Sequence, residues 1–366
     1  MEKVYEQLKA LTEVAAPSGF EDPLISIVKR RLEQYADEVD VDRVGNVTAI
    51  FKGKDPGGPE LLVFAHLDEV GLMVCKIEES GFLRFERIGG VPEKTLLGQF
   101  VEVFAVDGSR SYPGVIGAYA HHLTPDEAKR TIPAREQMYI DVGMGSREEV
   151  LAAGINAGSP VTYRASLTRL GKYRIAGKAL DNRIGVYLLL QAAEYLHRHR
   201  PAVTVYLVAS VQEEFNVRGL LPVFQKLQPA AAICLDITPA CDTPDLKMKY
   251  EIALGKGPAV TQMNFHGRGT LGGLIPNPRL RRFLERTAEE MQLPYQREVV
   301  IGVITDDAFT QLAGDEGTAM AHLSVPLRYT HAPIETADLR DIQWCASLIN
   351  EAISRFDGSL DLSRGR

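Results

Sequence analysis

The sequence predicts an α/β fold in which a mostly parallel sheet is flanked by helices and carries an inserted, small β-rich domain. From about residue 175 onward, apolar runs of strand length alternate with helical patterns, which is typical of a parallel sheet with helices on both faces. From about 71 to 164, short alternating segments are separated by frequent Gly and Pro, which indicates a separate β-rich unit. We therefore expect an α/β domain at 1–70 and 165–366 and an insert at 71–164.

The N-terminal elements each follow from a local pattern. Residues 3–15 and 22–36 carry apolar side chains three and four positions apart, which predicts two helices. Residues 39–53 alternate around a Gly–Asn pair, which predicts two short strands joined by a turn. The apolar run at 61–68 ends in polar residues, as a buried parallel strand does.

The C-terminal half predicts four strands and five helices in alternation. The expected strands are 203–211, 230–237, 297–305 and 318–325, and the expected helices are 184–199, 219–227, 277–292, 306–313 and 337–356. Pro278 falls in the first turn of its helix, where a missing N–H costs nothing.

Composition excludes several classes of protein. The chain has 366 residues, of which 45% are hydrophobic and 24% charged, with a net charge of -7. Basic residues cluster only near 199 and 281, on helical patterns that indicate solvated faces, so we expect no nucleic-acid partner. The four cysteines form no CxxC pair, residues 1–14 lack the apolar core that a signal peptide has, and no apolar run reaches roughly 20 residues. We expect a soluble cytoplasmic protein that does not bind membranes.

Candidate metal ligands stand where predicted strands end or a helix begins. They are His66, Asp68, Asp181, Glu213, Glu214, Asp236 and His331. In parallel sheets, ligands bind beyond the carboxyl ends of the strands. Each residue alone has a plainer interpretation, such as a helix cap for Asp181. Together, two imidazoles and several carboxylates are the ligand set of a two-metal hydrolytic centre.

Two pairs within this set suggest a division of roles. His66 and Asp68 lie two apart, so one could bind a metal while the other orients it through a hydrogen bond. Of the adjacent Glu213 and Glu214, one could bind a metal and the other could act as the general base that activates water.

Five motifs together carry a resemblance to a known family. HLDEVG, ALDNRIG, QEEFNVRG, LDITP and YTHAPIE occur in this order, and the chain resembles the dinuclear aminopeptidases that include glutamyl, deblocking and tetrahedral aminopeptidases, metallopeptidase family forty-two. The resemblance spans nearly the whole chain. It implies a zinc-peptidase type of sheet, peptide substrates and a PDZ-like insert. That insert would build dimers, which would assemble into a dodecamer with an enclosed chamber.

The resemblance also implies a role for each matching residue. His66 and Asp236 would bind one metal, Glu214 and His331 the other, and Asp181 would bridge both; Glu213 would be the general base and Asp68 would orient His66. The two ions would be zinc or cobalt. The peptide bond between Asp181 and Asn182 would be cis.

The sequence departs from the family pattern in three places. Asn216 stands where relatives usually have Gly, the segment around Asp306 and Asp307 is longer than expected, and residues 262–278 are unusually Gly-rich. Asp307 is a candidate for binding the substrate's amino group. Arg268 is a candidate for an acidic substrate side chain, as are Lys256 and His266.

Three other functions remain open from the sequence. Two carboxylates suffice for a glycosidase such as a glucanase, although that would leave both histidines unexplained. A metal-dependent deacylase or carboxypeptidase would use the same ligands on the same kind of sheet. A non-catalytic assembly protein would have no use for an extra carboxylate beside the metals.

Overall fold

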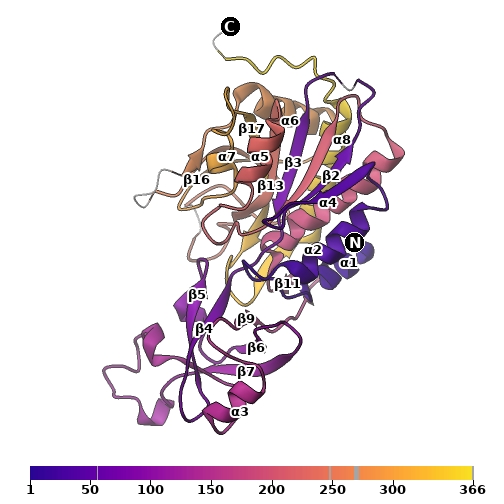
Figure 1. Ribbon diagram of the computed structural model, residues 1–366. Helices are drawn as coiled ribbons and strands as arrows, with labels where there is room; N and C mark the ends of the chain where they lie inside the picture. The colour runs from indigo at the N-terminus through magenta and orange to yellow at the C-terminus, as the bar shows by residue number, and fades with distance from the viewer. Residues whose placement is uncertain (56, 247–248, 268–271, 365–366) are drawn as a thin grey trace.

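The computed structural model describes residues 1–366 except 56, 247–248, 268–271 and 365–366. Within these residues the chain forms one large sheet covered by helices and a separate small β-barrel at one end of the molecule (Figure 1). The described part contains no helix long and apolar enough to cross a membrane.

Twelve strands of the described chain join in the large sheet. They are β1 Glu38–Val41, β2 Val47–Phe51, β3 Leu61–His66, β10 Thr168–Leu170, β11 Arg174–Gly177, β12 Val205–Ser210, β13 Ala231–Pro239, β14 Ala259–Phe265, β15 Gly273–Leu274, β16 Gln296–Ile301, β17 Ala319–Arg328 and β18 Glu335–Asp338. Their main order is β1-β2-β12-β3-β13-β17-β18-β11-β10; β14 branches from β17, and β15 and β16 pair with β14. The central strands β12, β3, β13 and β17 are parallel, whereas both flanks are antiparallel.

Helices cover both faces of this sheet. They are α1 Glu2–Thr12, α2 Asp22–Leu32, α4 Leu180–Arg198, α5 Leu221–Leu227, α6 Pro278–Glu290, α7 Asp307–Thr310 and α8 Leu339–Arg355. Helix α4 packs on β3 and β13, and α8 packs on α4 and β17. On the other face, Phe224 of α5 meets Phe64 of β3 edge to face, with ring centroids 5.7 Å apart. The sheet therefore has one core on each side.

The alternation of side chains along β3 determines which face carries the polar residues at its end. Leu61 and Val63 belong to the α4 core, whereas Leu62 and Phe64 belong to the α5 core. Because side chains two apart on a strand share a face, His66 continues the Leu62 and Phe64 row. Its ring therefore lies on the α5 side, at the carboxyl end of the parallel strands.

The insert closes as an antiparallel barrel with its own core. Its strands are β4 Gly71–Ile77, β5 Leu83–Ile88, β6 Phe100–Phe104, β7 Ser111–Gly117, β8 Tyr139–Asp141 and β9 Pro160–Tyr163, joined by η1 Glu93–Thr95, η2 His121–Leu123, η3 Arg135–Gln137 and α3 Arg147–Ala152. Inward-facing residues such as Val74, Val101 and Ile140 fill it. The resemblance implied a PDZ-like unit, and the structure shows a closed barrel.

Two predicted elements differ from the structure in ways that matter for the site, and three strands were not predicted. The strand expected at 297–305 ends at Ile301, because Gly302 adopts φ 105°, a left-handed conformation that favours glycine. The helix expected at 306–313 is reduced to the single turn α7. The strands β10, β11 and β18 were not predicted, and they form one edge of the sheet beyond β17.

Candidate metal centre

The side chains predicted as metal ligands converge at the carboxyl end of the parallel strands. His66 ends β3, Asp236 lies within β13, and Asp181 lies in the first turn of α4. The His66 Nε2 atom is 3.3 Å from Asp181 Oδ1 and 3.8 Å from Asp236 Oδ1. All three residues are buried. One imidazole therefore faces two carboxylates in a place from which solvent is largely excluded.

Asp181 lies between the two histidines. Its Oδ1 atom faces His66, whereas its Oδ2 atom lies 3.5 Å from His331 Nε2. The same His331 nitrogen is 3.3 Å from Glu214 Oε1. The peptide bond between Asp181 and Asn182 is cis. The arrangement thus has two halves that share one carboxylate.

Asp68 is fully buried behind His66 and holds the neighbouring loop. Its Oδ1 atom is 3.4 Å from His66 Nδ1 and accepts the backbone N–H of Glu213 at 3.1 Å. Its Oδ2 atom accepts the Glu214 N–H at 3.0 Å and the Ser18 hydroxyl at 2.6 Å. The carboxylate therefore faces the imidazole and holds the turn that presents both glutamates.

Two groups that sequence reasoning did not assign hold the other half of the site. Glu335 is buried, and its two carboxylate oxygens accept the backbone N–H groups of Asp181 at 3.0 Å and His331 at 2.7 Å. The Gly90 carbonyl of the barrel lies 3.2 Å from His331 Nδ1. A Cβ at Gly90 would lie 2.8 Å from that nitrogen. Glu335 ends the YTHAPIE motif and could have been found from it, whereas no local signal indicates Gly90.

The adjacent acids Asp306 and Asp307 face different surroundings. Asp306 is buried near the centre and accepts a hydrogen bond from the Ser210 hydroxyl at 2.8 Å. Its charge contributes to the raised pKa of Glu213. Asp307 does not line the cleft. It is completely buried, with Oδ2 2.6 Å from His322 Nδ1 and Oδ1 accepting the Thr305 hydroxyl. α7 thus turns the Asp307 side chain into the core, away from the cleft in which it was expected to bind substrate.

The remaining substrate candidates have mixed outcomes. Arg268 lies outside the described residues. Lys256 is exposed and does not line the cleft, whereas His266 does. Asn216, at the departure from the family pattern, also lines it.

A cleft of about 580 Å³ opens over the converging side chains. The barrel supplies Arg87, Gly89 and Gly90 to its wall. An apolar wall comes from the loops after β12 and β16, with Phe215, Val217, Val303 and Ile304. The site is therefore built jointly by the α/β sheet and the insert.

Burial and crowding of like charges dominate the electrostatics. Burial, together with neighbouring carboxylates, raises the pKa of Glu214 to about 8 and that of Asp236 to about 7. The pKa of Glu213 is raised well above its usual value for the same reasons. Burial alone would lower the pKa of His331, but Glu214 and Asp181 raise it to about 10. So many buried acids in one place strongly favour binding of cations.

Comparison with known proteins identifies the family. The family model described as M42 glutamyl aminopeptidase matches residues 45–348. The chain belongs to the M42 family. A putative aminopeptidase of Escherichia coli, SgcX, is 43% identical over 94% of this chain and 92% of its own length.

Solved structures support the same assignment. An aminopeptidase from the archaeon Desulfurococcus kamchatkensis has a TM-score of 0.90 and 38% identity, and the match covers 97% of this chain and 95% of that one. The TET1 peptidase of Pyrococcus horikoshii has a TM-score of 0.84 and 27% identity, over 96% of this chain and 99% of that one. As an M42 member, the protein is an aminopeptidase, a hydrolase that acts on peptide bonds.

Proposed function

We propose that the protein removes N-terminal residues from peptides with the help of two divalent metal ions. The observation that carries this proposal is the position of Asp181, whose two carboxylate oxygens each face a different histidine. A carboxylate held in this way can bridge two cations. The proposed ligands are His66 and Asp236 for one ion, Glu214 and His331 for the other, and Asp181 for both.

The donor set fits such ions. Imidazole nitrogens and carboxylate oxygens are the ligands of catalytic zinc sites, and they also suit cobalt. His66 Nδ1 lies 3.1 Å from the backbone carbonyl oxygen of Asp68, and His331 Nδ1 lies 3.2 Å from that of Gly90. Each ring therefore has a partner on the nitrogen that points away from the centre. Such partners fix the orientation of metal-binding histidines.

Glu213 is the proposed general base. Its Oε2 atom lies 3.9 Å from His66 Nε2, whereas Glu214 Oε1 lies 3.3 Å from His331 Nε2. Glu213 also lines the cleft while its backbone is held by Asp68. When bound, the two ions would polarise the scissile carbonyl and make water more acidic. Glu213 would take the proton from the attacking water and pass it to the leaving amine.

The alternative functions explain fewer of these contacts. A glycosidase needs two carboxylates, but it gives no role to the two histidines that face Asp181. A deacylase or carboxypeptidase would use the same centre and differs only in the substrate end that it recognises. Substrate choice therefore separates the aminopeptidase from its nearest alternatives.

The experiment combines metal removal with a choice of substrates. The purified enzyme is stripped with a chelator and then restored with Zn²⁺, Co²⁺ or Ca²⁺, the last as a control because it prefers a shell of oxygen ligands. Each form is assayed on aminoacyl chromogenic substrates, their N-acetylated forms and a β-glucan. We expect activity on free-amino substrates alone, lost on stripping and restored by Zn²⁺ or Co²⁺ but not Ca²⁺. Full activity in the stripped enzyme, or cleavage of the glucan or the acetylated substrates instead, would contradict the proposal.

We also propose that the insert mediates self-association into dimers and a dodecamer. The TET1 peptidase of Pyrococcus horikoshii can assemble into a tetrahedron or a large octahedral shell. In this chain the barrel segment between β7 and β8 exposes large apolar side chains: Tyr119, Leu123 and Ile132 are 69%, 79% and 56% exposed. Contact between copies would cover them. Light scattering of the full chain would measure the assembled mass.

A further inference from the structure

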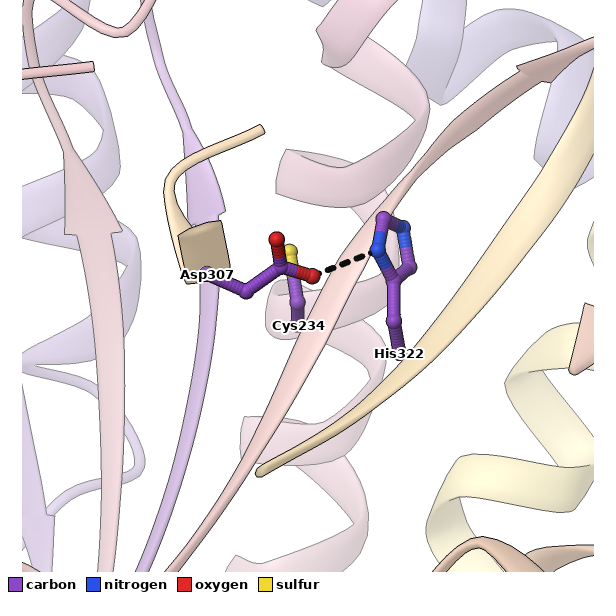
Figure 2. A group of neighbouring side chains, drawn as sticks. All are labelled: Cys234, Asp307 and His322. Atoms are coloured by element: carbon purple, nitrogen blue, oxygen red, sulfur yellow. Dashed lines mark ion pairs between the residues drawn. The ribbon is translucent and has the colours of Figure 1, made fainter. Parts of the chain in front are cut away.

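A second group of potential metal ligands lies beneath the floor of the cleft. Cys234 of β13, Asp307 of α7 and His322 of β17 each offer a ligand atom, and these atoms lie within 4.8 Å of one another. Figure 2 shows the three side chains pointing toward one another from three different elements. None of them belongs to the centre described above.

The register of the sheet brings two of these residues together. Cys234 and His322 are directly paired on the parallel strands β13 and β17. Cys234 lies in the same core as Met320, and His322, two residues after Met320, shares its face. The single turn α7 then places Asp307 above the pair. Polar groups thus lie between α7 and the sheet, next to an apolar core.

The cluster is buried, and its polar atoms are poorly satisfied. Cys234, Asp307 and His322 are 1%, 0% and 2% exposed. Both ring nitrogens of His322 and the Oδ2 atom of Asp307 lack a hydrogen bond of acceptable geometry within the described structure, although His322 Nδ1 and Asp307 Oδ2 are 2.6 Å apart. Buried polar groups normally have partners. An ion pair between Asp307 and His322 Nδ1 would still leave His322 Nε2 without a hydrogen-bond partner among the described residues.

We propose that Cys234, Asp307 and His322 bind a third, structural transition-metal ion of the zinc type. Sulfur, imidazole and carboxylate are the three ligand types of protein zinc sites, and thiolate ligation disfavours Mg²⁺ and Ca²⁺. Two ligands of one tetrahedral ion at ordinary bond lengths are about 3.4 Å apart. Binding would therefore separate Asp307 Oδ2 from His322 Nδ1 by a small rotation of either side chain.

The position of the cluster indicates a structural role. A Cys–His–Asp group can also act as a nucleophilic triad, but no substrate reaches a thiol that is 1% exposed. The ion would connect β13, β17 and α7. Thr305, which lines the cleft, donates its hydroxyl to Asp307 Oδ1 at 2.6 Å. The site would therefore hold the floor of the cleft in place.

Cobalt spectroscopy tests this proposal independently of the catalytic centre. The ligands proposed for the catalytic centre contain no sulfur, so a thiolate-to-cobalt charge-transfer band in the near ultraviolet would report a cysteine ligand. The full-length protein is loaded with Co²⁺, and its spectrum and metal content are compared with those of Cys234→Ser and of Cys345→Ser. Cys345 is an equally buried cysteine outside the cluster.

We expect the band in the wild type and in Cys345→Ser. In Cys234→Ser we expect the band to be absent and the metal content to fall by one ion per chain. The absence of the band in the folded wild type, or its persistence in Cys234→Ser, would overturn the proposal. If Cys234→Ser does not fold, a variant with Cys75, Cys241 and Cys345 all changed to serine decides the matter, because it keeps Cys234 alone. Retention of the band there supports the site, and loss of the band rejects it. Neither the cobalt spectrum nor the metal content depends on peptidase activity.

Discussion

The carboxylate of Asp68 accepts the backbone N–H of Glu213 at 3.1 Å, in addition to facing His66. Residues from the ends of two neighbouring strands are thereby held by one buried side chain. The neighbouring Glu214 N–H is bound by the same carboxylate. Asp68 therefore contacts both a proposed metal ligand and the backbone of the proposed base, and the second contact was not indicated by the H-x-D spacing.

Asp68→Asn should consequently damage both metal binding and turnover. An asparagine has a single acceptor oxygen, so its NH₂ group would face a donor N–H or the Ser18 hydroxyl. Loss of such a supporting group typically weakens metal affinity by about 10–100-fold. We expect a loss of that order in Zn²⁺ affinity and a parallel fall in kcat, measured by metal titration and steady-state kinetics.

Ser18→Ala is the matched control, because it removes one hydrogen bond to Asp68 and keeps the charge. Its effect should be clearly smaller. If both variants behave like the wild type in kcat and in Zn²⁺ affinity, Asp68 has no positioning role.

Glu213→Gln and Glu214→Gln separate the two roles proposed for the adjacent glutamates. Removal of a general base typically costs about 10²–10⁴-fold in rate, so Glu213→Gln should lose turnover by this order while its metal content is kept. Glu214→Gln should lose metal, because Glu214 faces His331. Elemental analysis and kcat of each variant provide the measurement. A steeper loss of metal in Glu213→Gln would show that the two roles are reversed.

The carboxyl ends of the central strands could be predicted from the sequence because each follows a local pattern. The apolar run before His66 ends where β3 ends, and the run before Asp236 forms most of β13, which continues to Pro239. Parallel strands bring such ends together.

The pairing of the barrel strands was not predictable in the same way. Closure of the insert depends on contacts between β4 and β9, about ninety residues apart, and no local pattern records them.

Side-chain direction in short turns was also beyond sequence reasoning. Asp306 and Asp307 are adjacent acids at the start of a single helical turn, where neighbouring side chains point in directions about 100° apart. Asp306 faces the centre, whereas Asp307 faces His322 in the core. The sequence shows two equivalent acids, and only the packing of α7 on the sheet distinguishes them.

Glu335→Gln should weaken the centre without touching any proposed ligand side chain. One carboxylate oxygen of Glu335 accepts the backbone N–H of Asp181, and the other accepts the backbone N–H of His331. A glutamine can accept only one of them with its oxygen, and its NH₂ group would face the other donor. An unsatisfied buried donor costs about 1–3 kcal/mol. We expect a lower free energy of unfolding and weaker Zn²⁺ binding, measured by denaturant titration of the stripped protein and by metal titration.

Glu298→Gln is the matched control for this change. Glu298 is as buried as Glu335, but its carboxylate accepts from the hydroxyls of Thr238, Thr261 and Ser324. A hydroxyl can accept as well as donate, so these partners can turn to receive the new NH₂ group, whereas a backbone N–H cannot. Glu298→Gln should therefore leave Zn²⁺ affinity unchanged. Equal losses of affinity in both variants would mean that loss of a buried charge, and not support of the Asp181 and His331 backbones, weakens the centre.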